Sequence, residues 1–438
     1  MSDRWLYGWG LASIGLGGAS LIVPLYAVEL GGGPITLGIL AAAAAAAGAP
    51  GALVVGRLAD RTGHRRGYVL GAIGVVAAGL AVVAAVDAIP VVIAANAAIW
   101  FAFAAATPVL TLLTVVGAPE ADWSDRIARL NEWQGVGWAL GLLVGFLVIV
   151  GGERLLGLDA LALQRAVCLV CATSAGVGGL VAVRTLPADP GAGTGPAPRR
   201  LRRALRGAAR FGVRGAGFPF TPARMDPRGL HPRRFARRFT PTLALYFAAV
   251  TLAFAGFGAF FAPLPAYLGS AGFGDDAVFG LYLALNVGAA VFFGAAGTLV
   301  ERYEVTLVHA GSLAVRGVAL PTVVLLGGVL VTTLPLFVVI GVTWAVIAVS
   351  AATLVTQLAP PIVRGEALGV YSALSTFASG AGSIVGGGLA AAGYVQAFGL
   401  ASGLIFAGAA VVLVLWRRVS NGSAAAERTG YSATDRTE

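Results

Sequence analysis

A short charged segment, GRLADRTGHRRG, begins at Gly56 and interrupts an otherwise apolar stretch of the chain. A carboxylate such as Asp60 can accept hydrogen bonds from the free N–H groups at a helix N-terminus, where the helix dipole is positive. Arg61 and Arg65 can pair with carboxylates on neighbouring loops, and Gly63 permits a tight turn while Gly56 permits close approach. Contacts of this kind form and break without covalent chemistry. The segment is therefore predicted to act as a conformational latch; the alternative is that its arginines only fix which side of the membrane the loop occupies.

Clusters of catalytic or metal-binding side chains are not expected. The chain has three histidines, His64, His231 and His309, and two of them lie in loops. The two cysteines, Cys168 and Cys171, lie in an apolar run without a second cysteine pair, which favours a packing role. A membrane enzyme needs His, Asp, Glu or Cys side chains that converge within its helices. We therefore expect no enzyme activity, no metal and no cofactor.

Ionisable side chains inside a membrane are costly, so they are candidates for function. Arg316 lies about eleven residues into the apolar run 305–327, where it can form a salt bridge or contact an anion. The alternative is that this helix begins later and that the Arg316 side chain extends to the membrane surface. Glu132, at the mouth of the run 133–151, and His309 are the candidates for proton coupling.

Membrane-spanning helices must position these residues. The chain has 438 residues, of which 58% are hydrophobic and only 11% are charged, whereas a soluble domain carries about 25% charged residues. The apolar runs are continuous rather than alternating, and about 20 residues suffice for a helix to cross the hydrocarbon core. The sequence predicts an all-α polytopic membrane protein. Its twelve predicted transmembrane helices are 6–27, 36–55, 68–86, 90–115, 133–151, 163–186, 241–268, 277–299, 305–327, 333–357, 366–391 and 396–416.

An internal repeat relates the two halves of the chain. The motif VPLY near the end of the first predicted helix recurs as LPAY near the end of the seventh, 241 positions later. The same shift carries Asp60 and Arg61 of GRLADR onto Glu301 and Arg302 of GTLVER. The chain is therefore predicted to contain two parallel six-helix repeats, a layout found in one large class of transporters.

Glycines recur at helical spacing in both halves. They occupy positions 137, 141 and 145 of the fifth predicted helix and positions 382 and 386 of the eleventh. Small residues on one helix face allow two helices to approach closely. Both stretches are therefore predicted to be packing faces.

The segment GRLADRTGHRR resembles the signature loop between helices 2 and 3 of the major facilitator superfamily. The shared pattern is a glycine, a small apolar pair, Asp-Arg, a glycine and a basic cluster; the second copy in this chain lacks the basic cluster. The resemblance covers essentially the whole chain. It implies a fold of twelve transmembrane helices in two pseudo-symmetric six-helix bundles, and it implies transport by alternating access.

The resemblance also implies a partner for Asp60. In the family the matching Asp meets the start of helix 11, which in this chain is the run Arg364, Gly365, Glu366. The remaining charged side chains of the loop, those of Arg57, His64 and Arg66, are expected to face solvent.

The expected organisation is an N-terminal six-helix half, a linker, a C-terminal six-helix half and a disordered tail, at residues 1–186, 187–240, 241–418 and 419–438. Arginine-rich and arginine-poor breaks between the predicted helices alternate, and arginine placement sets orientation. Both termini and the linker are therefore expected in the cytoplasm, with the chain in the plasma membrane. The arginine-rich linker could also lie on anionic lipid. We expect no nucleic-acid partner and a monomer.

Family analogy places the solute path along helices 1, 4, 7 and 10. The candidate path residues, with neighbours on helices 5, 8 and 9, are Ser20, Asn96, Trp100, Thr107, Thr111, Tyr246, Asn286, Arg316, Trp344, Thr353 and Gln357, with Gln134 and Tyr282 as similar candidates. Sparse hydrogen-bonding groups among apolar and aromatic ones favour export of a neutral or amphipathic drug-like solute. The alternatives are uptake of a sugar-like or organic-anion solute, the anion gaining support if Arg316 faces the path, and a non-transporting sensor on the same fold.

Overall fold

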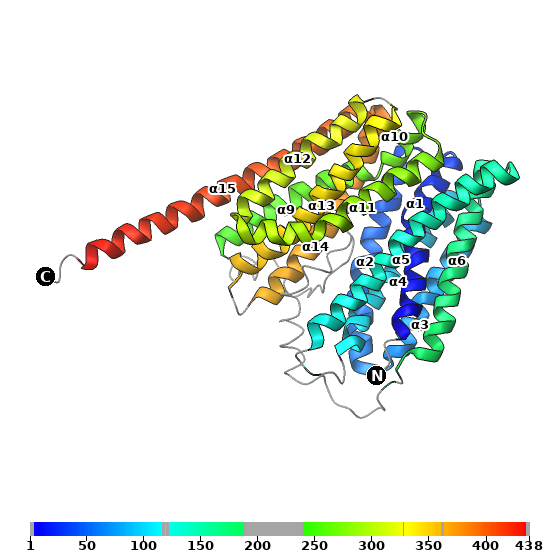
Figure 1. The fold of residues 1–438 in the computed structure, drawn as a ribbon, viewed down its shortest axis with the longest axis horizontal. Helices are drawn as coiled ribbons and strands as arrows, with labels where there is room; N and C mark the ends of the chain where they lie inside the picture. Colours follow the sequence, from blue (N-terminus) through cyan, green and yellow to red (C-terminus); the bar gives the residue numbers. More distant parts are fainter. Residues whose placement is uncertain are drawn as a thin grey trace.

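The computed structural model describes residues 4–115, 119, 122–187, 189, 240–326, 328–360 and 363–434, and within these residues it contains helices and no strands. The helices form two bundles, one from each half of the chain (Figure 1). The first bundle contains α1 (Trp5–Glu29), α2 (Pro34–Thr62), α3 (Arg65–Ala85), α4 (Ile89–Val115), α5 (Trp123–Gly151), a π-helical turn η2 (Gly152–Leu156) and α6 (Ala160–Thr185). The second contains α9 (Pro241–Phe261), α10 (Leu264–Ser270), α11 (Asp275–Arg302), α12 (Val305–Leu325), α13 (Leu330–Leu358), α14 (Arg364–Ala392) and α15 (Tyr394–Thr434).

Equivalent helices pack in the same way in both bundles. In the first, α1 packs on α5 and α6, α2 on α4, and α3 on α4 and α6. In the second, α9 packs on α14 and α15, α11 on α13, and α12 on α13 and α15. The pairs correspond one to one when α9 is matched to α1, the short α10 is counted with α9, and α11 to α15 are matched in order to α2 to α6. The internal repeat in the sequence is therefore also a repeat in the packing.

Glycine pairs at the repeat offset hold the innermost helices together. A Cβ atom on Gly17 of α1 would overlap the backbone of Trp138, and one on Gly141 of α5 would overlap the carbonyl oxygen of Ile14. The second half has Gly258 against the backbone of Ser379 and Gly382 against that of Ala255. The predicted glycine faces are thus close helix contacts, α1 with α5 and α9 with α14, where only the absence of a side chain allows the observed approach.

Among the described residues, eleven helical segments are long and apolar enough to cross a membrane. Pro34–Gly48 of α2 is a further apolar segment among the described residues, and α2 itself runs on to Thr62 and lies beside α4 like its counterpart in the second half. The all-α, multi-pass membrane architecture predicted from composition is therefore the observed one.

The start of α5 and the end of α9 differ from the predicted bounds for identifiable reasons. Helix α5 begins at Trp123, ten residues before the predicted start, because the segment WSDRIARLNE is too polar for a hydropathy pattern but rich in good helix formers. The predicted helix 241–268 is broken into α9 and α10 around Pro263, whose missing N–H cannot continue the hydrogen-bond ladder.

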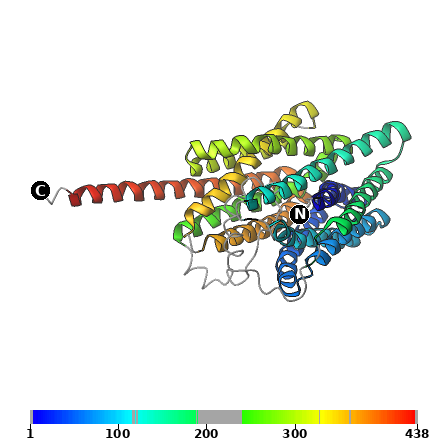
Figure 2. The same cartoon turned by 60° about the horizontal axis from the view of Figure 1, so that its bottom comes forward.

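The C-terminal helix is longer than predicted. The backbone of α15 continues as helix to Thr434, where we expected a disordered tail after residue 418, and Figures 1 and 2 both show this last stretch projecting past the other helices. The run AAAER within it favours helix. The predicted linker lies outside the described residues except for Pro187, Asp189 and Thr240.

The two halves contact each other through α2 with α14 and α5 with α11. We call the end of the bundles where α1 ends and α2 begins the far end, and the opposite one the terminus-bearing end. Gly38 of α2 lies against the carbonyl oxygen of Ser383, and Gly387 of α14 lies against that of Pro34. Gly145 of α5 likewise packs against a phenylalanine ring of α11. These contacts lie toward the far end, and the bundles diverge from there (Figure 1).

Candidate functional site

A cavity of about 660 Å³ lies between the two halves. Its lining comes from α1, α2, α4 and α5 of the first half and from α9 to α14 of the second, and it is mostly apolar. Pockets of about 300–1,000 Å³ with an apolar lining and a few polar groups are typical binding sites for small organic molecules. The cavity is therefore the candidate functional site.

Six of the predicted path residues line this cavity. They are Ser20, Asn96 and Trp100 from the first half and Asn286, Arg316 and Trp344 from the second, joined by the similar candidates Gln134 and Tyr282. Sequence reasoning missed the polar side of α14, where Thr376, Ser379 and Ser383 also line the cavity. Their helical spacing of three and four residues was a signal that could have found them.

Aromatic rings form the two facing walls. In the first half Trp100 lies edge-on to Phe103, with ring centroids 5.9 Å apart, and 6.0 Å from the tilted ring of Trp138. In the second half Phe254 and Phe257 both lie edge-on to Trp344. Rings in such arrangements provide large, rigid apolar surfaces for a ligand.

The amide side chains in the lining are only partly engaged by the protein. Asn286 donates to the carbonyl oxygen of Tyr282 at 2.7 Å, and Gln134 accepts from the Trp9 indole N–H at 3.2 Å. An amide side chain has two N–H donors and a carbonyl acceptor, so each retains capacity for a ligand. The cavity can therefore orient a solute by a few hydrogen bonds.

Arg316 is the one buried cation in the described lining. Its side chain is 2% exposed, and its Nη1 donates to the carbonyl oxygen of Ile340 at 2.8 Å and to the Thr343 hydroxyl at 3.2 Å. The guanidinium carbon lies 4.6 Å from the ring centre of Phe257, and the rings of Phe261 and Trp344 are also close. The side chain thus points to the cavity instead of extending to the membrane surface.

Glu132 lies at a different place from the one predicted. Because α5 begins at Trp123, Glu132 is inside this helix rather than at its mouth, and it lines the cavity while its side chain is exposed. Glu132 lies in the part of α5 nearer the terminus-bearing end, so the cavity lining extends toward that end.

The second coupling candidate, His309, lies outside the cavity lining. Its Nδ1 is 2.8 Å from the Ser350 hydroxyl and its Nε2 is 3.4 Å from the hydroxyl of Tyr246, and all three side chains are buried. They form a polar cluster inside the second half that joins α9, α12 and α13. Tyr246 is therefore also outside the lining.

The remaining path candidates do not line the cavity. The hydroxyls of Thr107, Thr111 and Thr353 donate to carbonyl oxygens of the preceding turn of their own helix, and Gln357 is exposed. Such intrahelical bonds satisfy a hydroxyl in an apolar setting.

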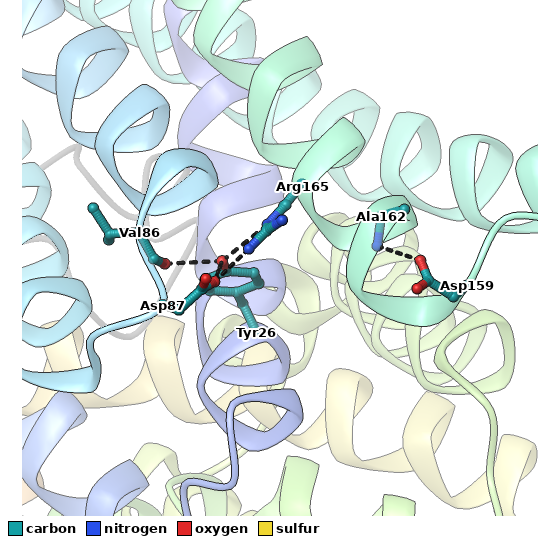
Figure 3. A network of polar contacts seen from close by, with 6 residues as sticks. All are labelled: Tyr26, Val86, Asp87, Asp159, Ala162 and Arg165. Carbon is teal, nitrogen blue, oxygen red and sulfur yellow. Dashed lines mark hydrogen bonds and ion pairs between the residues drawn. The ribbon is translucent and has the colours of Figure 1, made fainter.

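A polar cluster at the far end was not anticipated as a unit. Figure 3 shows the hydroxyl of Tyr26, which donates to the Val86 carbonyl oxygen at 2.9 Å and lies between Asp87 and Arg165. Arg165 forms an ion pair with Asp87, and this hydrogen bond holds the pKa of Asp87 below its usual value. The cluster ties the end of α1 to the α3–α4 loop and to α6.

One polar contact in the same region joins the two halves. Gln164 of α6 donates through Nε2 to Asp275 at the start of α11, at 2.7 Å. This bond reinforces the contacts of α2 with α14 and α5 with α11. The far end is thus closed by direct contact between the halves.

Comparison with protein families decides the family of this fold. The model of the Major Facilitator Superfamily matches residues 8–382, which is most of the chain. The chain belongs to the major facilitator superfamily. It is therefore a multi-pass membrane transporter and not an enzyme.

Solved structures of this superfamily share the fold at low sequence identity. The nucleoside transporter NupG is 14% identical with a TM-score of 0.71, covering 95% of this chain and 99% of that chain. A bacterial homologue of the human lysosomal transporter Spinster, inward-facing and occupied, is 15% identical with a TM-score of 0.68, covering 94% and 96%. The human organic anion transporter MFSD10 is 17% identical with a TM-score of 0.55, covering 93% and 98%. A search of curated proteins gives no match.

The segment that resembles the superfamily's signature loop is only partly described. The side chains of Asp60 and Arg61 on α2 and of Glu366 on α14, and the surroundings of Gly56 and Gly365, lie outside what the structure describes, so the predicted latch contact stays a prediction. Gly63 has φ +73° and ends α2, a left-handed conformation that favours glycine.

Four charged residues predicted to belong to the latch have described side chains: Arg65, Glu301, Arg302 and Arg364. They form no ion pair with another described residue. Arg65 is half-buried, Glu301 and Arg302 are exposed, and Arg364 donates to the carbonyl oxygen of Ala359 at 3.3 Å. Arg66, expected to face solvent, instead binds the end of α6. Its backbone N–H donates to Asp189 at 2.8 Å and its guanidinium donates to the Val183 carbonyl oxygen.

Proposed function

We propose that this transporter exports a small amphipathic organic solute by alternating access through the central cavity. The cavity of about 660 Å³ between the halves, with aromatic walls and a few amide and hydroxyl groups, is the observation that carries this proposal. A sugar-like solute would call for a denser polar lining than the mostly apolar one described. The apolar lining is instead suited to a solute with a sizeable hydrophobic body.

The proposed direction of transport follows from the orientation of the chain in the membrane and from the end at which the two halves are in contact. With both termini in the cytoplasm, as the arginine distribution indicates, a structure closed at the far end is open to the cytoplasm. A solute would then enter the cavity from inside the cell. Release outside requires the contacts of α2 with α14 and α5 with α11 to separate while the terminus-bearing end closes. The latch around Asp60 is proposed to form in that outward-open state, with the start of α14 as its partner.

The test is solute flux through purified full-length protein in proteoliposomes, with and without an imposed pH gradient. Drug-like compounds, sugars and organic anions are screened, and we expect protein-dependent flux for amphipathic compounds. The Trp100→Ala variant is expected to reduce that flux about two- to twelvefold, because a ring contact is worth about 0.5–1.5 kcal/mol beyond its area.

The matched control is Phe377→Ala, an aromatic side chain that is 47% exposed and outside the cavity lining. It is expected to leave flux unchanged. Folded protein that moves no compound of any class would contradict transport and favour a sensor on the same fold. Flux of sugars alone would contradict the proposed solute class.

A further inference from the structure

Arg316 is a buried charge whose hydrogen-bonding capacity is incompletely used. Among the described residues its partners are one carbonyl oxygen, one hydroxyl and three aromatic faces, with no carboxylate in ion-pair reach. Both hydrogen bonds come from Nη1, while the buried Nε has no acceptor. A guanidinium has five N–H donors, and a buried charge normally requires a counter-charge to offset its desolvation.

The open side of this guanidinium faces the cavity. Arg316 reaches the lining from α12, and the rings beside it, Phe257, Phe261 and Trp344, are themselves lining residues. Cation–π contacts hold the positive charge in place without neutralising it. The acidic lining residue Glu132 is on the first half, is exposed and makes no ion pair with Arg316. The counter-charge of Arg316 is therefore missing from the described protein.

We propose that Arg316 is an anion subsite and that the transported solute is an amphipathic organic monoanion of the carboxylate class. This inference rests on the proposed function, since it names the solute of the same cavity. A carboxylate can take the free N–H groups of the guanidinium, which matches its planar geometry. The hydrophobic body of the solute then lies against the aromatic walls. A single guanidinium neutralises one negative charge, so a dianion would leave one charge uncompensated in an apolar cavity.

The competing explanation is that Arg316 only links α12 to α13. Its bonds to Ile340 and Thr343 do join these two helices. A purely linking arginine would contribute to folding but would not make binding depend on the charge of a ligand. Charge selectivity is therefore the readout that separates the two explanations.

The experiment compares naphthalene-1-acetate with its uncharged amide, naphthalene-1-acetamide, which has the same ring and nearly the same shape. Equilibrium binding of each radiolabelled compound is measured on full-length protein in nanodiscs of neutral lipid. The wild-type chain is expected to bind the carboxylate at least tenfold more tightly than the amide. This comparison requires no variant, so it stands even if substitution of Arg316 impairs folding.

Two variants of Arg316 test whether this residue causes the preference for the carboxylate over the amide. In Arg316→Gln the carboxylate is expected to bind at least tenfold more weakly while affinity for the amide changes less than twofold, and Arg316→Lys is expected to keep part of the preference. Arg154→Gln, at an exposed arginine in η2, is the matched control and is expected to behave as wild type.

Equal binding of the two compounds by the wild type, binding of neither, or an unchanged preference in Arg316→Gln would overturn the anion subsite. The proposed function fails by a different result, the absence of flux for every solute class. Flux of neutral amphipathic compounds without a preference for carboxylates would support the proposed transport function and contradict only the anion subsite at Arg316.

Discussion

Tyr26 and Tyr267 perform the same structural task in the two halves. The Tyr26 hydroxyl donates to the carbonyl oxygen of Val86 at the end of α3, and the Tyr267 hydroxyl lies 3.3 Å from that of Val323 at the end of α12. The tyrosines are 241 positions apart, and each binds a carbonyl oxygen near the end of the equivalent helix. The first half adds the ion pair of Asp87 with Arg165, whose equivalents at the same offset are glycine and phenylalanine.

This ion pair makes a pH-dependent contribution to stability. The Arg165 hydrogen bond depresses the pKa of folded Asp87, so the carboxylate stabilises the fold above the ordinary Asp pKa of about 3.9. The contribution is lost as pH falls through the depressed value. Since both side chains are substantially exposed, Asp87→Asn is expected to lower the unfolding midpoint at pH 7 by only about 1–2 °C.

The measurement is thermal unfolding in detergent at pH 7 and at pH 3. At pH 3 the difference between wild type and Asp87→Asn is expected to shrink. In an Arg165→Gln background, Asp87→Asn is expected to have a smaller effect at pH 7 than in the wild type, with only the Tyr26 hydrogen bond left to Asp87. A difference that grows as the pH falls would contradict the assigned role of the ion pair.

Single polar residues were predictable as candidates but not as members of the site. Asn96, Asn286 and Arg316 stand out because polar groups in apolar helices are expensive, and all three line the cavity. Tyr246 and His309 have the same signature, yet they bond to each other inside one bundle. The sequence indicates that burying a polar side chain costs free energy, but it does not indicate which neighbouring side chain forms the hydrogen bond that offsets this cost.

At the scale of helices, glycine determines which pairs come closest. Gly141 of α5 sits where a Cβ would overlap the backbone of α1, and its repeat partner Gly382 sits equally close to α9. The offset of 241 therefore marks the contacts that support the cavity walls, because α5 and α14 both carry lining residues.

Gly141→Ala is expected to destabilise the protein by about 1–3 kcal/mol, the usual cost of overpacking. The matched control is Gly176→Ala on α6, where a Cβ would meet nothing within 4 Å and the better helix propensity of alanine is expected to be neutral or slightly stabilising. Thermal unfolding of both variants in detergent tests this. Equal midpoints for the two variants would show that the close contact at Gly141 relaxes without cost.

Hydropathy predicts the membrane-embedded parts of helices but not their full length. It located the apolar part of α5 and omitted the polar turns that place Glu132 inside the helix. It also joined α9 to α10, since Pro263 interrupts the backbone without changing the apolar character of the run. Helix propensity and proline geometry, rather than transfer to lipid, decide these boundaries.

At the scale of the whole molecule, the two halves are joined mainly by small residues. Gly38, Ser383 and Gly387 let α2 and α14 touch backbone to backbone, and the bond of Gln164 to Asp275 adds a single polar link. An interface of this kind has little interdigitation of large side chains, so it can separate without repacking either bundle. Which end is closed could not be predicted from the sequence, because both states use the same helices.

Adding one methyl group at this interface is expected to shift the balance between the two states. A Cβ on Gly38 would overlap the Ser383 carbonyl oxygen, and overpacking of this size costs about 1–3 kcal/mol. The cost applies only to the state in which the far end is closed, because only there do α2 and α14 touch at this point. That cost corresponds to a change of about 5- to 150-fold in the ratio of the two states. Gly38→Ala is therefore expected to populate a state that is open at the far end.

Spin labels at two far-end positions, one in each half, measure this shift. Leu155 and Val331 are 83% and 82% exposed, and the labels replace them in a background where Cys168 and Cys171 are alanine. Double electron–electron resonance is expected to show an added population at longer distance in Gly38→Ala. Gly74→Ala, where a Cβ would meet nothing within 4 Å, is expected to keep the wild-type distribution. Identical distributions in all three proteins would mean that the α2–α14 contact does not control which end is closed.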